Sequence, residues 1–239
     1  AVDTSALNFG DITVSDRNEG INYYGVENLN IALGEGNDEV NVQATNQETI
    51  TNIDSGAGDD QFHISSTADG SFIDQESASG TLDYVNGELN IEAGSGQNAI
   101  FISDFDSENG DNNILMANGL ITGLSQGEIT YTSTLGDFNN GFVVWTSQGD
   151  DRITITAVDL TGETSNQLYT GKGNDDIEVI VSDDIDSPLH AMYADKNQRV
   201  LQIWSGEGGD VIDASQSQLA VNVRSGDGED IVKGGDGVD

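Results

Sequence analysis

Apolar and polar residues alternate along this chain in short runs separated by acidic, glycine-rich turns. Leu29 and Ile31 flank Asn30, and Ile153 and Ile155 flank Thr154. Strict alternation over a few residues predicts β-strands that send every second side chain inward. No stretch shows a helical period for longer than a turn or two, so the pattern indicates an all-β protein.

One unit of strand, turn and strand recurs along the chain, and its five-residue turn follows the pattern Gly-x-Gly-x-Asp. Apolar residues occupy the position seven before the last turn residue and the position two after it. The units are LNIALGEGNDEVNV (29–42), TNIDSGAGDDQFHI (51–64), LNIEAGSGQNAIFI (89–102), FVVWTSQGDDRITI (142–155), NQLYTGKGNDDIEV (166–179), LQIWSGEGGDVIDA (201–214) and VNVRSGDGEDIVKG (221–234). The earlier apolar residues are Ile31, Ile53, Ile91, Val144, Leu168, Ile203 and Val223, and the later ones are Val40, Phe62, Ile100, Ile153, Ile177, Ile212 and Val232. The closing GGDGVD (234–239) begins an eighth unit.

A longer period lies over the short one. Residues 29–102 align with 142–214 at an offset of 112 to 115, which predicts two tandem units, 1–117 and 118–239, within one continuous fold. Steps of 20 to 24 residues between turns suit one coil of a right-handed parallel β-solenoid, and steps of 35 to 53 suit several coils or a coil that carries a loop, such as 65–88 or 182–198. An antiparallel sandwich is the competing architecture. The solenoid is favoured because only a solenoid stacks equivalent turns into a ladder.

Composition narrows the range of partners. The chain has 43 acidic and 7 basic residues, a formal net charge of -36, and no cysteine. Such a surface repels nucleic-acid phosphates and anionic membranes, so we expect cations as partners, with no nucleic acid and no membrane insertion. No run approaches the roughly 20 apolar residues of a membrane span. The lack of cysteine fits a reducing compartment or a secreted protein stabilised by metal.

Stacked strands lie about 4.8 Å apart, so stacked turns bring their carboxylates into register. Like charges at this spacing repel one another, which favours a cation between successive turns. Carboxylate and backbone carbonyl oxygens are hard ligands, which predicts several calcium ions rather than zinc or copper. Asp and Asn also serve glycine turns by purely local hydrogen bonds, and Asn98 in the third turn is interpreted in this way.

Ser205-Gly-Glu-Gly-Gly-Asp-Val-Ile, Ser225-Gly-Asp-Gly-Glu-Asp-Ile-Val and Lys233-Gly-Gly-Asp-Gly-Val-Asp239 resemble the calcium-binding nonapeptide G-G-x-G-x-D-x-U-x of RTX (hemolysin-type) proteins. The resemblance implies a calcium-bound parallel β-roll that is exported unfolded and folds in external calcium. It implies side-chain ligands at Asp38, Asp60, Asp151, Asp175, Asp210, Asp230 and Asp239. It also implies carbonyl ligands at the first and third turn positions, namely Gly34, Gly36, Gly56, Gly58, Gly171, Gly173, Gly206, Gly208, Gly226 and Gly228. The chain departs from the family in its wide spacing, in Asn98 at an Asp position and in Ser147 at a Gly position.

Aromatic residues recur six positions before the last turn residue, at Trp145, Tyr169 and Trp204. Alternation points them outward, which predicts an aromatic stripe able to stack on sugar rings, unless a loop within 181–199 covers it. The same alternation predicts that His63 faces solvent. The seven basic residues are scattered, and no pair among the many carboxylates stands out, so we expect no enzyme activity.

The sequence therefore predicts a calcium-binding structural or adhesive module of a secreted, extracellular or cell-surface protein. The alternatives are a carbohydrate-binding module that uses the aromatic stripe and a β-helix enzyme acting on polysaccharides. Partners other than calcium would be a surface polysaccharide or further copies stacked head to tail, the last turn at Asp239 meeting residues near Leu7–Val14 of another copy. The alternative to head-to-tail stacking is that the eighth unit, which is incomplete at Asp239, continues in a longer parent protein.

Overall fold

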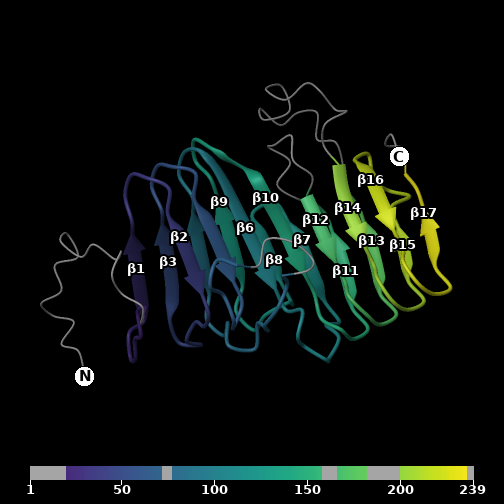
Figure 1. Ribbon diagram of the computed structural model, residues 1–239, viewed down its shortest axis with the longest axis horizontal. Helices are drawn as coiled ribbons and strands as arrows, with labels where there is room; N and C mark the ends of the chain where they lie inside the picture. The colour runs from purple at the N-terminus through teal and green to yellow at the C-terminus, as the bar shows by residue number, and fades with distance from the viewer. Residues whose placement is uncertain (1–19, 72–76, 158–165, 182–199, 236–239) are drawn as a thin grey trace, which may run out of the picture.

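The computed structural model describes residues 20–71, 77–157, 166–181 and 200–235. These residues form strands and turns without any helix, and the strands build two largely parallel sheets. Figure 1 shows the sheets as the two walls of an elongated coil whose axis runs across the strands. The protein is a parallel β-solenoid, as the recurrence of equivalent glycine turns predicts.

A ten-stranded sheet forms one wall. Its strands, in spatial order, are β1 (Asn28–Ala32), β3 (Ile50–Asp54), β5 (Leu89–Glu92), β9 (Ile129–Thr132), β8 (Leu120–Thr122), β7 (Ile114–Ala117), β11 (Arg152–Ile155), β13 (Asp176–Val179), β15 (Val211–Asp213) and β17 (Ile231–Lys233). Only β8 is antiparallel to its neighbours, so β7, β8 and β9 form a meander within the parallel sheet.

A seven-stranded sheet forms the opposite wall. Its strands, in spatial order, are β16 (Ala220–Arg224), β14 (Val200–Trp204), β12 (Asn166–Tyr169), β10 (Asp137–Trp145), β6 (Gln97–Ser103), β4 (Gln61–Ile64) and β2 (Glu39–Val42). Each coil contributes strands to both sheets, and the chain turns at two edges between them.

The core lies between the sheets and consists of columns of equivalent residues. Ile53 pairs with Ile91, and Phe62 pairs with Ile100, so each inward residue packs on its counterpart one coil away. The apolar positions expected to face inward do so, with Ile31, Val40 and Val223 partly buried against the core. Val232, in the last described strand, is 48% exposed. Parallel strands buried on one face in this way hold their register, because a one-residue slip would turn the apolar set outward.

The glycine turns of the first and second halves of the chain lie at opposite edges of the solenoid. The turns at 34–38, 56–60 and 94–98 lead from the ten-stranded sheet to the seven-stranded sheet, at edge A. Those at 147–151, 171–175, 206–210 and 226–230 lead from the seven-stranded sheet back, at edge B. In Figure 1 the first set lies along the upper edge toward the N-terminus and the second along the lower edge toward the C-terminus. The second set of turns is therefore offset from the first by half a coil in addition to whole coils.

Candidate functional site

A ladder of aspartates runs along edge B, at the last position of each turn. Each side chain accepts a hydrogen bond at Oδ1 from the backbone amide of its counterpart one coil earlier. The bonds join the Asp111 amide to Asp151 (2.7 Å), the Asp151 amide to Asp175 (2.9 Å), the Asp175 amide to Asp210 (3.0 Å) and the Asp210 amide to Asp230 (3.0 Å). The carboxylates thus replace main-chain carbonyls as acceptors where the strands give way to turns.

The second carboxylate oxygens of this ladder are buried, and several have no donor. Among the described residues, the Oδ2 atoms of Asp111, Asp175 and Asp210 accept no hydrogen bond. Asp151 differs, because the Thr146 hydroxyl donates to its Oδ2 atom and the Ser147 hydroxyl donates to Oδ1. An ionised carboxylate that is buried and incompletely paired costs several kcal/mol, which either a proton or a cation relieves.

Burial controls the ionisation of these groups. Removal from water raises the pKa of Asp175 to about 7, and the hydrogen bond from the Asp151 amide offsets only part of this effect. Burial, together with the nearby charges of Asp104, Asp151 and Asp83, raises the pKa of Asp111 to about 7. The pKa of Asp210 is raised by burial as well. At neutral pH these carboxyl groups therefore favour binding either a proton or a cation, because each neutralises their charge.

Glycine is required where successive turns stack. Gly208 has a φ of 141°, and a Cβ atom added there would lie 1.6 Å from the carbonyl oxygen of Gly173 in the preceding turn. No side chain fits that space. The third-position carbonyl oxygens therefore point along the stack at the glycine of the next turn.

The first-position carbonyl oxygens also face along the stack. The Gly171 carbonyl accepts from the Glu207 amide at 3.0 Å, and the Gly206 carbonyl accepts from the Asp227 amide at 2.8 Å. The turns thereby continue the parallel hydrogen bonding of the sheets around the edge, as the bridges Lys172–Glu207 and Glu207–Asp227 show. Each carbonyl oxygen keeps a second lone pair.

Edge A carries the same ladder with one substitution. The Asp38 amide donates to Asp60 Oδ1 and the Asp60 amide to Asn98 Oδ1, both at 2.9 Å. The Oδ2 atom of Asp60 accepts no hydrogen bond within the described residues. Asn98 places a donor there instead, since its Nδ2 atom donates to the Ser133 hydroxyl at 3.2 Å. Asn98 is thus a structural turn residue, as expected, and it shows that an uncharged side chain fits this position.

A second, exposed ladder runs in the opposite sense one residue earlier in the turns. Asn37 Oδ1 accepts from the Asp59 amide, and Asp59 Oδ1 accepts from the Gln97 amide, both at 2.9 Å. At edge B, Asp150 accepts from the Asn174 amide and Asn174 accepts from the Gly209 amide. The buried and the exposed ladders together tie several amides in this part of the turn to both neighbouring coils.

The donor set fits calcium in kind. Carboxylate oxygens without donors and carbonyl oxygens with a spare lone pair are the hard ligands that calcium takes. In the described part of the chain, no three His, Cys, Asp or Glu side chains form a group able to hold a metal by themselves, so backbone oxygens would have to complete the coordination. Six of the seven predicted side-chain ligands lie in the buried aspartate ladders of edges A and B, namely Asp38, Asp60, Asp151, Asp175, Asp210 and Asp230. The seventh, Asp239, lies outside the described residues.

Two stacked turns escaped the sequence pattern. Residues 107–111 begin the edge B ladder: the Gln148 amide donates to the Ser107 carbonyl, and the Asp111 carbonyl accepts from the Arg152 amide. The core residue Ile114 follows Asp111 by three positions rather than two, which hid the match. At edge A, residues 133–137 stack on 94–98, with the Asp137 amide donating to the Gly96 carbonyl.

A hydroxyl ladder was also missed. The Thr170 hydroxyl donates to the Ser205 carbonyl at 3.1 Å, and the Ser205 hydroxyl donates to the Ser225 carbonyl at 3.0 Å. These residues precede the first turn position. The recurrence of Ser or Thr there, at Ser55, Thr146, Thr170, Ser205 and Ser225, was a signal in the sequence that could have revealed it.

The aromatic residues form a stack, but the exposure expected for it is not observed. Trp145 and Tyr169 have ring centroids 5.7 Å apart, Tyr169 and Trp204 are 4.4 Å apart, and the Arg224 guanidinium lies 5.5 Å from the Trp204 ring. Trp145 is fully buried and Tyr169 is 7% exposed. They belong to a second apolar cluster on the outer face of the seven-stranded sheet, to which Ala68 and Phe105 contribute from the connections after β4 and β6. Only Trp204 remains partly accessible for a ligand.

The prediction that His63 faces solvent is wrong. His63 is buried and stacks on Phe101 with ring centroids 4.9 Å apart. It does lie on the outer face of β4, but Phe101 and the chain segment after β4 turn that face into a small core. His190 lies outside the described residues.

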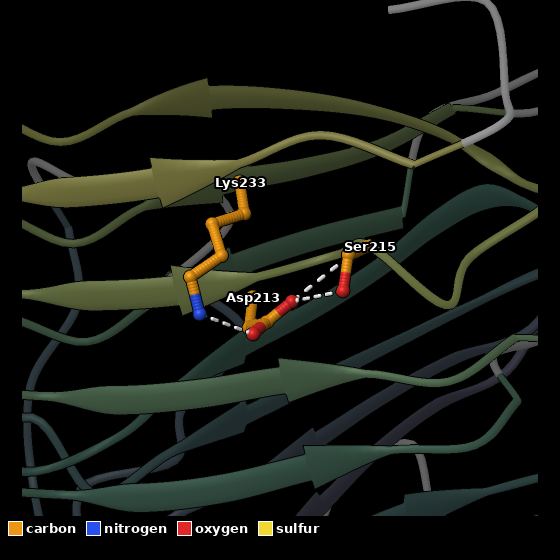
Figure 2. A network of polar contacts seen from close by, with 3 residues as sticks. All are labelled: Asp213, Ser215 and Lys233. Carbon is orange, nitrogen blue, oxygen red and sulfur yellow. Dashed lines mark hydrogen bonds and ion pairs between the residues drawn. The ribbon is translucent and has the colours of Figure 1, made fainter.

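Several of the basic side chains form bridges between coils. Arg152 lies 3.5 Å from Asp176, and Lys172 lies 3.8 Å from Glu207. Figure 2 shows the shortest of these three contacts, in which Lys233 Nζ lies 2.6 Å from Asp213 Oδ2 while the Ser215 amide and hydroxyl donate to Asp213 Oδ1. These contacts lower the pKa of Asp213 to about 2. Exposed pairs of this kind contribute little stability each, but they reduce repulsion between coils.

Comparison with protein families, curated proteins and solved structures finds no match for this chain. No helix among the described residues is long and apolar enough to cross a membrane. Proposals about function therefore rest on the buried aspartate ladders at edges A and B and on the surfaces of the sheets.

Proposed function

We propose that this chain is a calcium-stabilised structural module of a secreted or cell-surface protein. Calcium ions along edges A and B hold neighbouring coils together, and the module has no catalytic role. Asp38, Asp60, Asp151, Asp175, Asp210 and Asp230 supply carboxylate oxygens, and the glycine carbonyls of the turns supply the remaining protein ligands.

One observation carries this proposal. Asp60, Asp175 and Asp210 are buried, each uses Oδ1 for the ladder, and each keeps an Oδ2 atom that accepts no hydrogen bond from any described residue. A buried oxygen of this kind is unfavourable when ionised, and a divalent cation shared with carbonyl oxygens removes the penalty. The formal net charge of -36 adds long-range attraction for cations.

The chemistry of the site supports an extracellular location. Calcium modules that work outside cells commonly bind with dissociation constants of about 10⁻⁴ to 10⁻³ M, which suits sites with few ligands per turn. A secreted chain without cysteine needs another source of rigidity, and bound metal provides it.

Thermal unfolding followed by circular dichroism tests the proposal. We expect the melting temperature to rise steadily with calcium from excess chelator to several millimolar, because an ion that binds only the folded state stabilises it by mass action. Magnesium and sodium chloride at matched ionic strength serve as controls, since they screen charge without fitting the site. Equal melting temperatures in chelator and in calcium would refute the proposal, and an equal rise with magnesium would reduce it to charge screening.

A further inference from the structure

The outer face of the ten-stranded sheet is hollowed into a groove of about 400 Å³ across β1, β3, β5 and β9. Side chains from equivalent positions of these strands form two parallel rows along it. The first row contains Asn30, Asn52, Asn90 and Thr130, and the second contains Asp54, Glu92 and Thr132. The groove faces away from the core and shares none of the turn residues of the two ladders.

The first row is a hydrogen-bonded amide ladder. Asn52 Nδ2 donates to Asn30 Oδ1 at 2.9 Å, and Asn90 Nδ2 donates to Asn52 Oδ1 at 3.0 Å. The Thr130 hydroxyl donates to Asn90 Oδ1 at 2.5 Å and ends the row. An amide has two N–H donors and two acceptor lone pairs, so Asn52 keeps one of each that no described residue uses. The ladder thus fixes the amides and presents paired donors and acceptors to the groove.

The second row supplies acceptors. Glu92 is held by the Thr132 hydroxyl at 2.6 Å and by the backbone amides of Gly94 and Thr134. These hydrogen bonds lower the pKa of Glu92 despite its partial burial, so the side chain stays ionised and accepts hydrogen bonds. Asp54, paired with Glu92 in register, is exposed. The coils of β3 and β5 therefore each offer an amide and, beside it, a carboxylate acceptor, while Thr130 and Thr132 of β9 continue the two rows with hydroxyl groups.

This arrangement matches the chemistry of a sugar polymer. Neighbouring hydroxyl groups both donate and accept, which suits an amide next to a carboxylate. Equivalent groups recur at the strand spacing of about 4.8 Å, so a ligand with repeating units engages successive coils in the same way. None of the described residues that line the groove is basic, and Asp54 and Glu92 repel anionic glycans.

We propose that the groove over β1, β3, β5 and β9 binds a neutral, hydroxyl-rich polysaccharide chain lying across the strands. The site is distinct from the aromatic stack, where Trp145 and Tyr169 are buried on the other sheet. Asn52 and Asp54 contribute most directly, since Asn52 keeps an unused donor and acceptor and Asp54 is exposed. Binding of this kind is independent of calcium at the turns.

Affinity electrophoresis tests the proposal with the folded chain in calcium-containing buffer. The gels contain dextran, galactomannan or a soluble β-glucan, with alginate as the anionic control. We expect retardation by at least one neutral polymer and none by alginate. Asn52→Ala and Asp54→Ala should each weaken binding about three- to tenfold, as expected for the loss of one or two hydrogen bonds. Asp54→Ala alters only an exposed side chain, so its result stands even if Asn52→Ala fails to fold.

Asn222→Ala is the matched control, because Asn222 is an exposed asparagine on β16 of the opposite sheet. It should bind like the parent chain. Mobility unchanged in all three neutral polymers would overturn the proposal. So would binding that Asp54→Ala leaves intact, or binding lost on Trp204→Ala instead, which would assign the ligand to the aromatic stack. If the chain folds equally well without calcium and still binds the polymer, the proposed calcium-dependent function is refuted while the polysaccharide site stands.

Discussion

The Oδ1 atom of Asp175 accepts a hydrogen bond from the backbone amide of Asp151 at 2.9 Å, although the two residues are 24 positions apart. The same relationship joins each motif aspartate to its counterpart along edge B and, through Asn98, along edge A. One oxygen of each carboxylate therefore belongs to the backbone hydrogen bonding of the solenoid. The other oxygen is available to bind a cation. Substitutions can distinguish the structural role of the first oxygen from the cation-binding role of the second.

Substitutions at Asp210 separate these roles. Asp210→Ala removes the acceptor of the buried Asp175 amide, and we expect it to cost about 1 to 3 kcal/mol of unfolding free energy with or without calcium. Asp210→Asn keeps an oxygen at the acceptor position, as Asn98 does at edge A, and loses only the charge. It should be as stable as the parent chain or more stable in chelator, yet gain less from calcium.

Urea unfolding with and without calcium measures both effects, and isothermal titration calorimetry gives the calcium stoichiometry. Asp230→Ala should likewise lower calcium binding, because Asp230 continues the same ladder. If Asp210→Asn gains as much stability from calcium as the parent chain does, its carboxylate is not a ligand.

Gly208→Ala should be among the most damaging single substitutions in the turns. The added Cβ would lie 1.6 Å from the Gly173 carbonyl oxygen, and the residue has a φ of 141°. We expect a loss on the order of 3 kcal/mol or more, since neither the clash nor the strain relaxes without displacing a coil. The neighbouring Gly209→Ala is the control. Its Cβ would lie 3.3 Å from the Asn174 side-chain oxygen and 3.5 Å from the Glu229 carbonyl oxygen, without a severe clash, so a change below about 1 kcal/mol is expected. Equal losses in the two variants, measured by urea unfolding, would contradict the stacking of the turns.

Asp104 should give the metal-free chain a pH-dependent stability. Burial raises the pKa of Asp104 to about 6. The Leu82 amide, which donates a hydrogen bond to its carboxylate at 2.5 Å, offsets part of this increase. A carboxyl group whose pKa is higher in the folded state destabilises the fold as pH rises from its unfolded pKa of about 4 through 6. Stability in chelator should therefore fall over this interval.

Asp104→Asn keeps an acceptor for the Leu82 amide and removes the charge. We expect it to stabilise the chain at pH 7.5 by about 2 kcal/mol and to have little effect at pH 4, as shown by the melting temperature at each pH. A variant whose stability parallels that of the parent at every pH would show that Asp104 is not the source of the dependence.

The aromatic stack should act mainly as a structural element. Trp145→Ala empties a fully buried site beside Tyr169, and we expect a loss of about 3 to 5 kcal/mol. Trp204→Ala, at the partly exposed end of the stack beside Arg224, should cost clearly less. Near-ultraviolet circular dichroism and urea unfolding check both variants. A small and equal cost at the two positions would mean that the stack is dispensable for folding.

The sequence by itself determined the strands, the glycine turns and the inward-facing columns, because these depend on local alternation and on turn chemistry. Ile53, Phe62 and Ile177 face the core as their positions predict. It also indicated that steps of 20 to 24 residues make one coil, as the pairing of β1 with β3 and of β14 with β16 confirms. Stacked turns with their carboxylates in register followed from this arrangement.

Only the tertiary structure decided which edge each turn occupies and what covers the outer faces. The meander of β7, β8 and β9 and the turns at 107–111 and 133–137 lie between the third and the fourth glycine turn of the sequence pattern, and the turns before and after this region occupy opposite edges. The alternation correctly sent His63 and Trp145 outward from their strands. Alternation specifies the face of a sheet, however, while burial depends on what packs against that face. Trp145 is buried in a cluster to which the connections after β4 and β6, distant from it in sequence, contribute Ala68 and Phe105. The burial of the motif carboxylates has the same origin, since it requires a neighbouring coil on either side of each turn.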